Sequence, residues 1–304
     1  MLQTLPNELQ DLIVVLIDSS IRNLTKLRTV SHSLDDTVRR FLKTLKHIDE
    51  ETTSTINDTA LKLFSGLKTL DLKWNKIITD EGIKDLKLEG LNLRDNDRIT
   101  GESIKHMTLK ILDLSSNNVI TNDDIKDLPL QHLSLVQNTL ITDRGIRNKP
   151  IRTLLIDQNT NITNECVKWF DLETLSLDEN YTITDDAIKH LTSLTKLVLS
   201  DNNTITNEGI RHLTSLKKLD LSNNNMITDE SIEHLLLSEI KLQSNFVVTI
   251  EALKKMTSLA TVNIGVNEMM TNYFSFVHNG CLTLDKLSCL PHLQIVYQNF
   301  TINE

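Results

Sequence analysis

Asparagine recurs at intervals of 21 or 22 residues along most of this sequence. Each copy is preceded by Leu-x-x-Leu-x-Leu-x-x and followed by x-x-Ile-Thr-Asp/Asn-x-x-Ile-x-x-Leu, with small departures. A fixed period of this length indicates stacked structural units, each of which buries its apolar side against its neighbours. The positions in register are Asn75, Asn96, Asn117, Asn138, Asn159, Asn180, Asn202, Asn224, Asn245 and Asn267.

The first half of each repeat predicts a short strand. Alternate side chains of a strand point to opposite faces, so Leu70 and Leu72 should enter the core while Asp71 faces out. The asparagine comes where the chain leaves the strand. We expect it to be buried, with its amide bonded to backbone groups of its own turn and of the next repeat, because unpaired buried groups cost about 1–3 kcal/mol each.

The second half of each repeat predicts a short helix. In residues 78–86, Thr79 is placed to cap the first turn, and Asp80 lies at its positive end. Ile83 and Leu86 then form the inward edge of the helix. Parallel strands on one side and helices on the other are therefore expected.

This pattern resembles the leucine-rich repeat, over about residues 45–271. The resemblance implies an α/β solenoid, a horseshoe with parallel strands on its concave face and short helices on its convex face. The predicted organisation is a helical N-terminal module in 1–44, repeats in 45–271 and a C-terminal cap in 272–304, which includes a last strand-like stretch in 290–298.

The N-terminal segment does not follow the period. Its apolar residues fall on helical stripes, and it resembles an F-box, the module that docks on a Skp-type adaptor of cullin-based ubiquitin ligases. The same helices could instead serve only as a cap that shields the first strand. The resemblance assigns adaptor binding to Leu5, Pro6, Glu8, Leu9, Leu12, Ile13, Leu16, Leu27, Val30 and Ser31.

Composition and charge argue against several classes of protein: nucleic-acid-binding, membrane-spanning and secreted. A net charge of −9 argues against nonspecific nucleic-acid binding, which relies on Lys and Arg. The apolar run from Leu12 to Ile17 is too short for a membrane span and lacks the basic flank of a signal peptide. Three cysteines form no disulfide framework, and a cytoplasmic or nuclear location is expected. We expect no cofactor.

Several reactive side chains occupy repeat positions. His190, His212 and His234 recur before the last helix leucine, where the position elsewhere holds other polar groups, so we predict no metal site. Cys166 fills a position that holds small residues in other repeats, which indicates packing and not a nucleophile. No phosphate loop or catalytic triad pattern appears, and the near-constant spacing leaves no protruding catalytic loop within the repeats. We therefore expect a non-catalytic protein.

Binding is expected at the variable positions of the strand face, because leucine and asparagine are committed to the core. Two apolar residues with carboxylates beside them are suited to a basic, partly apolar protein surface, and Trp and Arg are enriched at interface hot spots. The candidates are Trp74, Arg94, Val136, Leu155, Asp157, Asp178, Val198 and Asp201. The leading hypothesis is a substrate receptor of a Skp/cullin/F-box ubiquitin ligase. The alternative is a free-standing scaffold or inhibitor.

Overall fold

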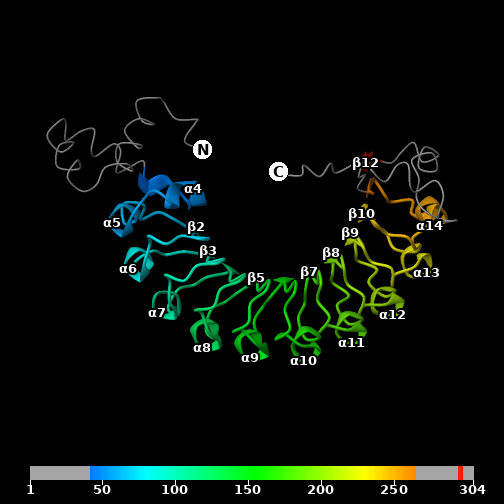
Figure 1. The fold of residues 1–304 in the computed structure, drawn as a ribbon, viewed down its shortest axis with the longest axis horizontal. Coiled ribbons are helices and arrows are strands. Elements are labelled where there is room, and N and C mark those ends of the chain that lie inside the picture. Colours follow the sequence, from blue (N-terminus) through cyan, green and yellow to red (C-terminus); the bar gives the residue numbers. More distant parts are fainter. Residues whose placement is uncertain (1–41, 265–293, 297–304) are drawn as a thin grey trace. The chain divides into compact units, whose positions relative to one another are not determined.

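The computed structural model describes residues 42–264 and 294–296. Within this part the chain divides into two compact units, one of residues 42–130 with 144–146 and one of residues 131–143, 147–264 and 294–296. Each unit is a stack of repeats with short strands on one side and short helices on the other (Figure 1). The predicted N-terminal module lies outside the described residues, except for residues 42–44.

The first unit holds a parallel sheet in which each strand pairs with the next along the chain. Leu70, Leu91 and Leu112 are aligned across neighbouring strands. The strands are β1 (His47–Ile48), β2 (Thr69–Asp71), β3 (Gly90–Asn92) and β4 (Ile111–Asp113). The helices are α4 (Glu50–Thr53), α5 (Asp58–Leu61), α6 (Asp80–Ile83), α7 (Gly101–Ile104) and α8 (Asn122–Ile125).

The second unit repeats the same topology. Its strands, again parallel and in sequence order, are β5 (His132–Ser134), β6 (Thr153–Leu155), β7 (Thr174–Ser176), β8 (Lys196–Val198), β9 (Lys218–Asp220), β10 (Glu239–Lys241), β11 (Thr261–Asn263) and β12 (Gln294–Val296). Its helices are α10 (Asn164–Val167), α11 (Asp185–Ile188), α12 (Asn207–Ile210), α13 (Asp229–Ile232) and α14 (Ile250–Lys255). Helix α9 (Asp143–Ile146) begins in this unit, and its last three residues group with the first.

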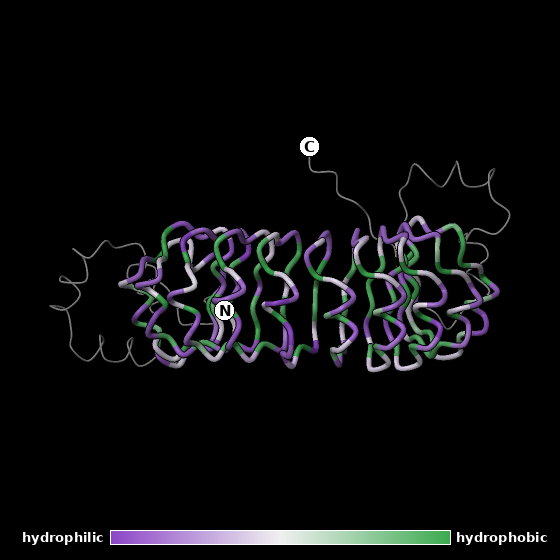
Figure 2. Tube along the Cα trace, turned by 90° about the horizontal axis from the view of Figure 1, so that it is seen from below, coloured by the Kyte–Doolittle hydropathy of each residue, from purple (hydrophilic) through white to green (hydrophobic). Residues whose placement is uncertain are grey.

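The core consists of the leucines and isoleucines of the repeat. In one repeat, Leu175, Leu177, Ile183 and Ile188 are fully buried, and the other described repeats bury the same positions. Figure 2 shows these hydrophobic segments returning with every turn of the chain. Burial of one such side chain stabilises the fold by about 1.5–3 kcal/mol. The predicted solenoid of parallel strands and short helices is confirmed.

The buried asparagines join successive repeats. The Nδ2 group of Asn202 donates to the carbonyl oxygens of Leu177 at 3.1 Å and Asn180 at 2.6 Å, and its Oδ1 accepts the backbone N–H groups of Thr204 and Ile205. The side-chain amide therefore bonds to the preceding repeat. The predicted bond to the next repeat was wrong, because the two carbonyl oxygens that accept from the amide belong to the repeat before. The described members, all buried, are Asn75, Asn96, Asn117, Asn138, Asn159, Asn180, Asn202, Asn224 and Asn245.

A second set of bonds joins the helix starts. The backbone N–H and hydroxyl of Thr206 donate to the two carboxylate oxygens of Asp185 in the preceding repeat, at 2.9 and 2.6 Å. Thr79 makes the same bonds to Asp58 and does not cap its own helix through its side chain, contrary to the prediction. The same pairing occurs at Thr100 with Asp80, Thr163 with Asp143, and Thr249 with Asp229.

Candidate functional site

Parallel register places three candidate positions of the second unit in one row on the strand face. Leu155, Ser176 and Val198 are the last residues of β6, β7 and β8 and are aligned with one another. Leu155 and Val198 are half-buried, and Ser176 between them is buried. The row therefore presents two apolar side chains that flank a small polar one.

The next row, two residues further along each repeat, contains two acids. It holds Val136, Asp157 and Asp178, all half-buried. The backbone N–H of Asp178 donates to Asp157 Oδ1 at 2.9 Å, and the Ser200 hydroxyl donates to Asp178 Oδ1 at 2.6 Å. Burial raises the pKa of the Asp157 carboxyl above its ordinary value, while hydrogen bonds from Ser176 and Asp178 act in the opposite direction. Neighbouring groups thus hold both carboxylates in place.

A third row has left-handed backbone, which sequence reasoning missed although it named two members of the row, Trp74 and Asp201, as candidates. Asp201, the remaining acidic candidate, has φ of 49° and accepts a hydrogen bond from Asn223 Nδ2 at 3.1 Å. The signal in the sequence is the residue directly before each ladder asparagine, which is mostly a small or polar residue that tolerates positive φ. The described members are Trp74, Asp95, Ser116, Gln137, Gln158, Glu179, Asp201, Asn223 and Ser244.

Exposed apolar side chains follow the ladder asparagines of the second unit. Tyr181 lies one residue after its asparagine, Met226 two residues after, and Phe246 one residue after. The Tyr181 hydroxyl donates to the carbonyl oxygen of Asp201 at 3.3 Å, which ties this rim to the left-handed row. The sequence argument missed these residues because, for partner binding, it considered no position after the ladder asparagine.

The two candidates of the first unit share one carboxylate. Trp74 is 53% exposed and has φ of 56°, an unusual backbone conformation for a bulky residue. Its indole Nε1 donates to Asp95 Oδ2 at 3.0 Å, and Arg94 Nε lies 3.4 Å from the same oxygen. The Lys73 ammonium lies 5.0 Å from the centre of the Trp74 ring. Trp74 and Arg94 therefore form one cluster around Asp95.

The predicted adaptor-binding residues, from Leu5 to Ser31, lie outside the described residues. On the helix side, His234 Nε2 lies 2.8 Å from the carbonyl oxygen of Arg211, and no group of three potential metal ligands occurs in residues 42–264 or 294–296. Cys166 is buried, and burial raises the pKa of its thiol to about 12. The thiol is therefore protonated at neutral pH, as its packing role requires.

Family models match three stretches of this pattern. Leucine Rich repeats (2 copies) matches residues 192–236, and Leucine Rich repeat matches residues 67–87 and 105–128. The chain carries leucine-rich repeats. Leucine-rich repeats are scaffolds for protein interaction, and this chain is such a scaffold. No helix in the part of the chain that the structure describes is long and apolar enough to cross a bilayer.

Solved leucine-rich-repeat structures resemble the chain at low identity. A chain of the yeast Rad7 and Elc1 complex has 20% identity and a TM-score of 0.49, with 80% of this chain and 88% of that chain covered. An internalin (inlF) from Listeria monocytogenes has 20% identity and a TM-score of 0.46, with coverage of 87% and 67%. The Toll–Spatzle complex of Drosophila has 16% identity and a TM-score of 0.49, with coverage of 79% and 37%. A comparison with curated protein sequences gives no match.

Proposed function

We propose that the strand face of the second unit binds a basic, partly apolar segment of a protein partner. The observation that carries this proposal is the pair of half-buried apolar residues, Leu155 and Val198, beside the carboxylates of Asp157 and Asp178. Asp201 in the left-handed row adds a further carboxylate. An apolar centre with fixed charges at its edge is the usual arrangement of a protein-binding surface.

The carboxylates are held before a partner arrives. Asp157 and Asp178 accept hydrogen bonds from neighbouring groups, so their orientation needs little further ordering on binding. A lysine or arginine of the partner would offset the mutual repulsion of these two carboxylates and the cost of their burial. Tyr181 on the rim offers an aromatic contact of the type enriched at interfaces.

A defined peptide pair tests this face. We expect acetyl-Arg-Leu-Lys-Leu-Arg-amide to bind saturably and acetyl-Glu-Leu-Glu-Leu-Glu-amide not to bind, measured by calorimetry at low and high salt. The double variant Leu155→Ser with Asp178→Asn should bind the basic peptide at least about tenfold more weakly. Asp186→Asn, which removes an exposed carboxylate on helix α11, is the matched control. Equal binding of the two peptides, or an equal loss in the control, would contradict the proposal.

We further propose that residues 5–34 dock on a Skp-type adaptor, so that the repeats present a captured protein for ubiquitin transfer by other subunits. The F-box resemblance of the N-terminal sequence supports this step, and the strand face supplies the surface for the captured protein. Purified Skp-type adaptor should be retained by the full chain and lost with Leu9→Asp plus Ile13→Asp. Lack of retention by the wild-type chain would remove this step and leave the scaffold.

The alternative is a free-standing scaffold or inhibitor whose N-terminal helices serve only as a cap that continues from residues 42–48. These residues contact the first complete repeat: Leu42 is buried, β1 pairs with β2, and a Cβ on Gly66 would meet the carbonyl oxygen of Lys43 at 1.9 Å. In this case deletion of residues 1–40 should destabilise the first repeats, and adaptor should bind neither form. Amide exchange of β2 with and without the deletion, together with the adaptor assay, separates the two functions.

A further inference from the structure

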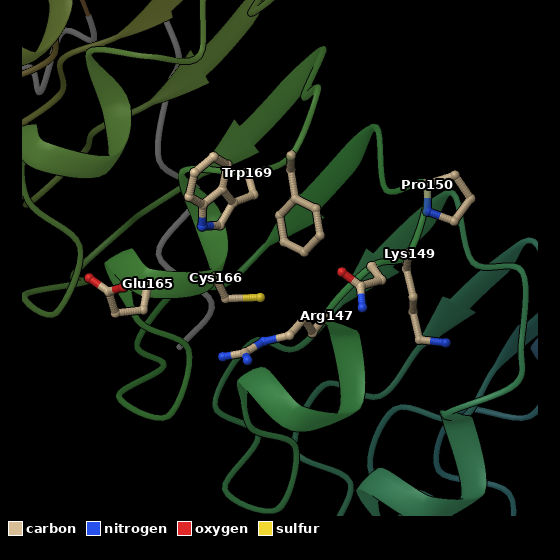
Figure 3. A pocket seen from close by; sticks show the side chains of 8 residues that line it. Arg147, Lys149, Pro150, Glu165, Cys166 and Trp169 are labelled. Carbon is tan, nitrogen blue, oxygen red and sulfur yellow. The ribbon is translucent and has the colours of Figure 1, made fainter.

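A pocket opens on the helix side of the second unit, away from the strand face. It lies between residues 147–150 and helix α10, and its volume is about 550 Å³. Figure 3 shows Arg147 and Trp169 on opposite sides of the Cys166 side chain. This volume is sufficient for one large side chain with the backbone that carries it.

The pocket exists because residues 147–150 depart from the repeat. The eleventh residue after each ladder asparagine is otherwise apolar, as in Leu191, Leu213 and Leu235, but here it is Lys149, which is 8% exposed. Asn148 before it has φ of 64°, and Pro150 follows. The chain therefore leaves the helical path at Arg147, which has ψ of 138°, and the pocket lies beside this turn.

Arg147 supplies a positive charge to this space. In other repeats the base at this position pairs with an acid three residues earlier, as Lys168 does with Glu165 at 2.8 Å and Lys189 with Asp186 at 2.7 Å. Three residues before Arg147 the sequence has Arg144 instead. Among the described residues, Arg147 forms no ion pair. Its guanidinium is thus available to an anion.

Trp169 supplies an aromatic wall. It is 79% exposed and lines the pocket together with Phe170. The Lys168 ammonium lies 5.7 Å from the centre of the Trp169 ring. Glu165, the acid that also lines the pocket, is neutralised by its pair with Lys168. The pocket therefore combines unneutralised positive charge with apolar surface.

We propose that this pocket binds the C-terminal residue of a partner polypeptide that ends in an apolar side chain. Such a residue carries a carboxylate and an apolar group on one Cα atom, which fits a space of this size. Arg147 binds the carboxylate through paired N–H groups, the geometry that guanidinium groups favour. Trp169 and Phe170 contact the apolar side chain. This site does not depend on the proposed function of the strand face.

The intrinsic fluorescence of Trp169 can report occupancy directly. The chain has two tryptophans, so Trp74→Phe leaves Trp169 as the sole indole in an otherwise intact protein. Three probes are titrated into this variant: acetyl-Gly-Ser-Gly-Phe with a free carboxylate, the same peptide as its C-terminal amide, and acetyl-Gly-Ser-Gly-Gly with a free carboxylate. We expect a saturable fluorescence change with the first peptide, and at least about tenfold weaker binding of the other two.

Two arginine variants locate the anion. Arg147→Gln should weaken binding of the free acid at least about tenfold and leave the amide unchanged, so that acid and amide become equal. Arg144→Gln is the matched control, because Arg144 lies three residues away and pairs with Asp123 at 2.6 Å. It should bind all three peptides as the Trp74→Phe parent does. Equal binding of acid and amide by the parent, equal losses in both arginine variants, or no saturable change would overturn the proposal.

Discussion

Each buried asparagine makes several hydrogen bonds through one side-chain amide, and none of these bonds can be replaced by water in the core. Asn202 shows this most simply, because its exposed neighbour Asn203 is chemically identical. Asn202→Ala would leave the carbonyls of Leu177 and Asn180 and two N–H groups without this partner. We expect a loss of about 3 kcal/mol in the free energy of unfolding, against at most about 0.5 kcal/mol for Asn203→Ala.

Urea denaturation followed by circular dichroism measures both variants. Equal midpoints for Asn202→Ala and Asn203→Ala would show that the ladder contributes little to stability.

Asp157 illustrates the opposite case, a side chain whose charge is unfavourable in the free protein. Burial holds its folded-state pKa above the unfolded value. The folded state therefore binds more protons between these two pKa values, and the wild-type protein loses stability as pH rises through that window, above about pH 4. An asparagine side chain cannot ionise but keeps an oxygen that accepts from the Asp178 N–H. The stability of Asp157→Asn relative to the wild type should therefore increase between about pH 4 and about pH 7.

Thermal unfolding of both proteins at about pH 4 and about pH 7 measures this gain. The same variant should bind the basic peptide less tightly, because a carboxylate of the proposed surface is lost. If the stability of the wild type relative to the variant increased as the pH rises, burial would not raise the pKa of Asp157.

The short helices are held by bonds between repeats rather than by their own length. The usual arrangement is an acid at the first helical residue, which accepts from the threonine of the next repeat. At Gly101 this acid is missing, and Asp124 Oδ2 of the following helix accepts the Thr121 N–H at 2.8 Å and its hydroxyl at 2.7 Å instead. A Cβ on Gly101 would meet Asp124 Oδ1 at 1.8 Å, so the two positions are coupled.

An exchange of these residues tests the coupling. Asp124→Gly should cost about 1–3 kcal/mol because Thr121 loses its acceptor, and Gly101→Asp should be destabilising because two carboxylates meet. The double variant restores the usual arrangement and should recover most of the loss, with an interaction energy of about 1 kcal/mol or more. Additive losses in the double-mutant cycle, measured by urea unfolding, would refute the coupling.

Elements of this fold could be predicted because each follows from a repeated local pattern. Alternation of Leu70 and Leu72 indicates the strand, and Ile83 with Leu86 indicates the inward helix edge. The partner of Thr79 could not be predicted in this way. A threonine at a helix start has the same local sequence whether or not it also bonds the acid of the repeat before, so the bonds from Thr79 to Asp58 depend on the stacking of repeats.

The candidate site could be predicted only where strand alternation fixes the face, as for Leu155 and Val198. The left-handed row and the apolar rim follow from turn geometry, and the pocket follows from departures at Lys149 and Trp169 that look like neutral variation when read one residue at a time. Their position next to one another becomes visible only when residues 147–150 and helix α10 are seen together (Figure 3).

At the scale of the whole molecule, the repeat gives stability through uniform positions and leaves function to the exceptions. Lys149 is such an exception, since a buried lysine occupies a position that the neighbouring repeats fill with the apolar residues Leu128 and Phe170. Lys149→Leu replaces a buried amine with a hydrocarbon side chain and should raise the free energy of unfolding by about 1–2 kcal/mol. The same change removes a basic group that lines the pocket, so it should weaken binding of the peptide that ends in phenylalanine at least about tenfold.

The control is Lys196→Leu, which places leucine at an exposed position of β8 and should change stability by at most about 0.5 kcal/mol. Urea midpoints and the Trp169 fluorescence titration together give both quantities for each variant. A Lys149→Leu protein that is less stable and binds the peptide unchanged would mean that Lys149 serves the fold and that the pocket does not depend on it. Greater stability with weaker binding would show that Lys149 lowers the stability of this repeat and contributes to ligand binding.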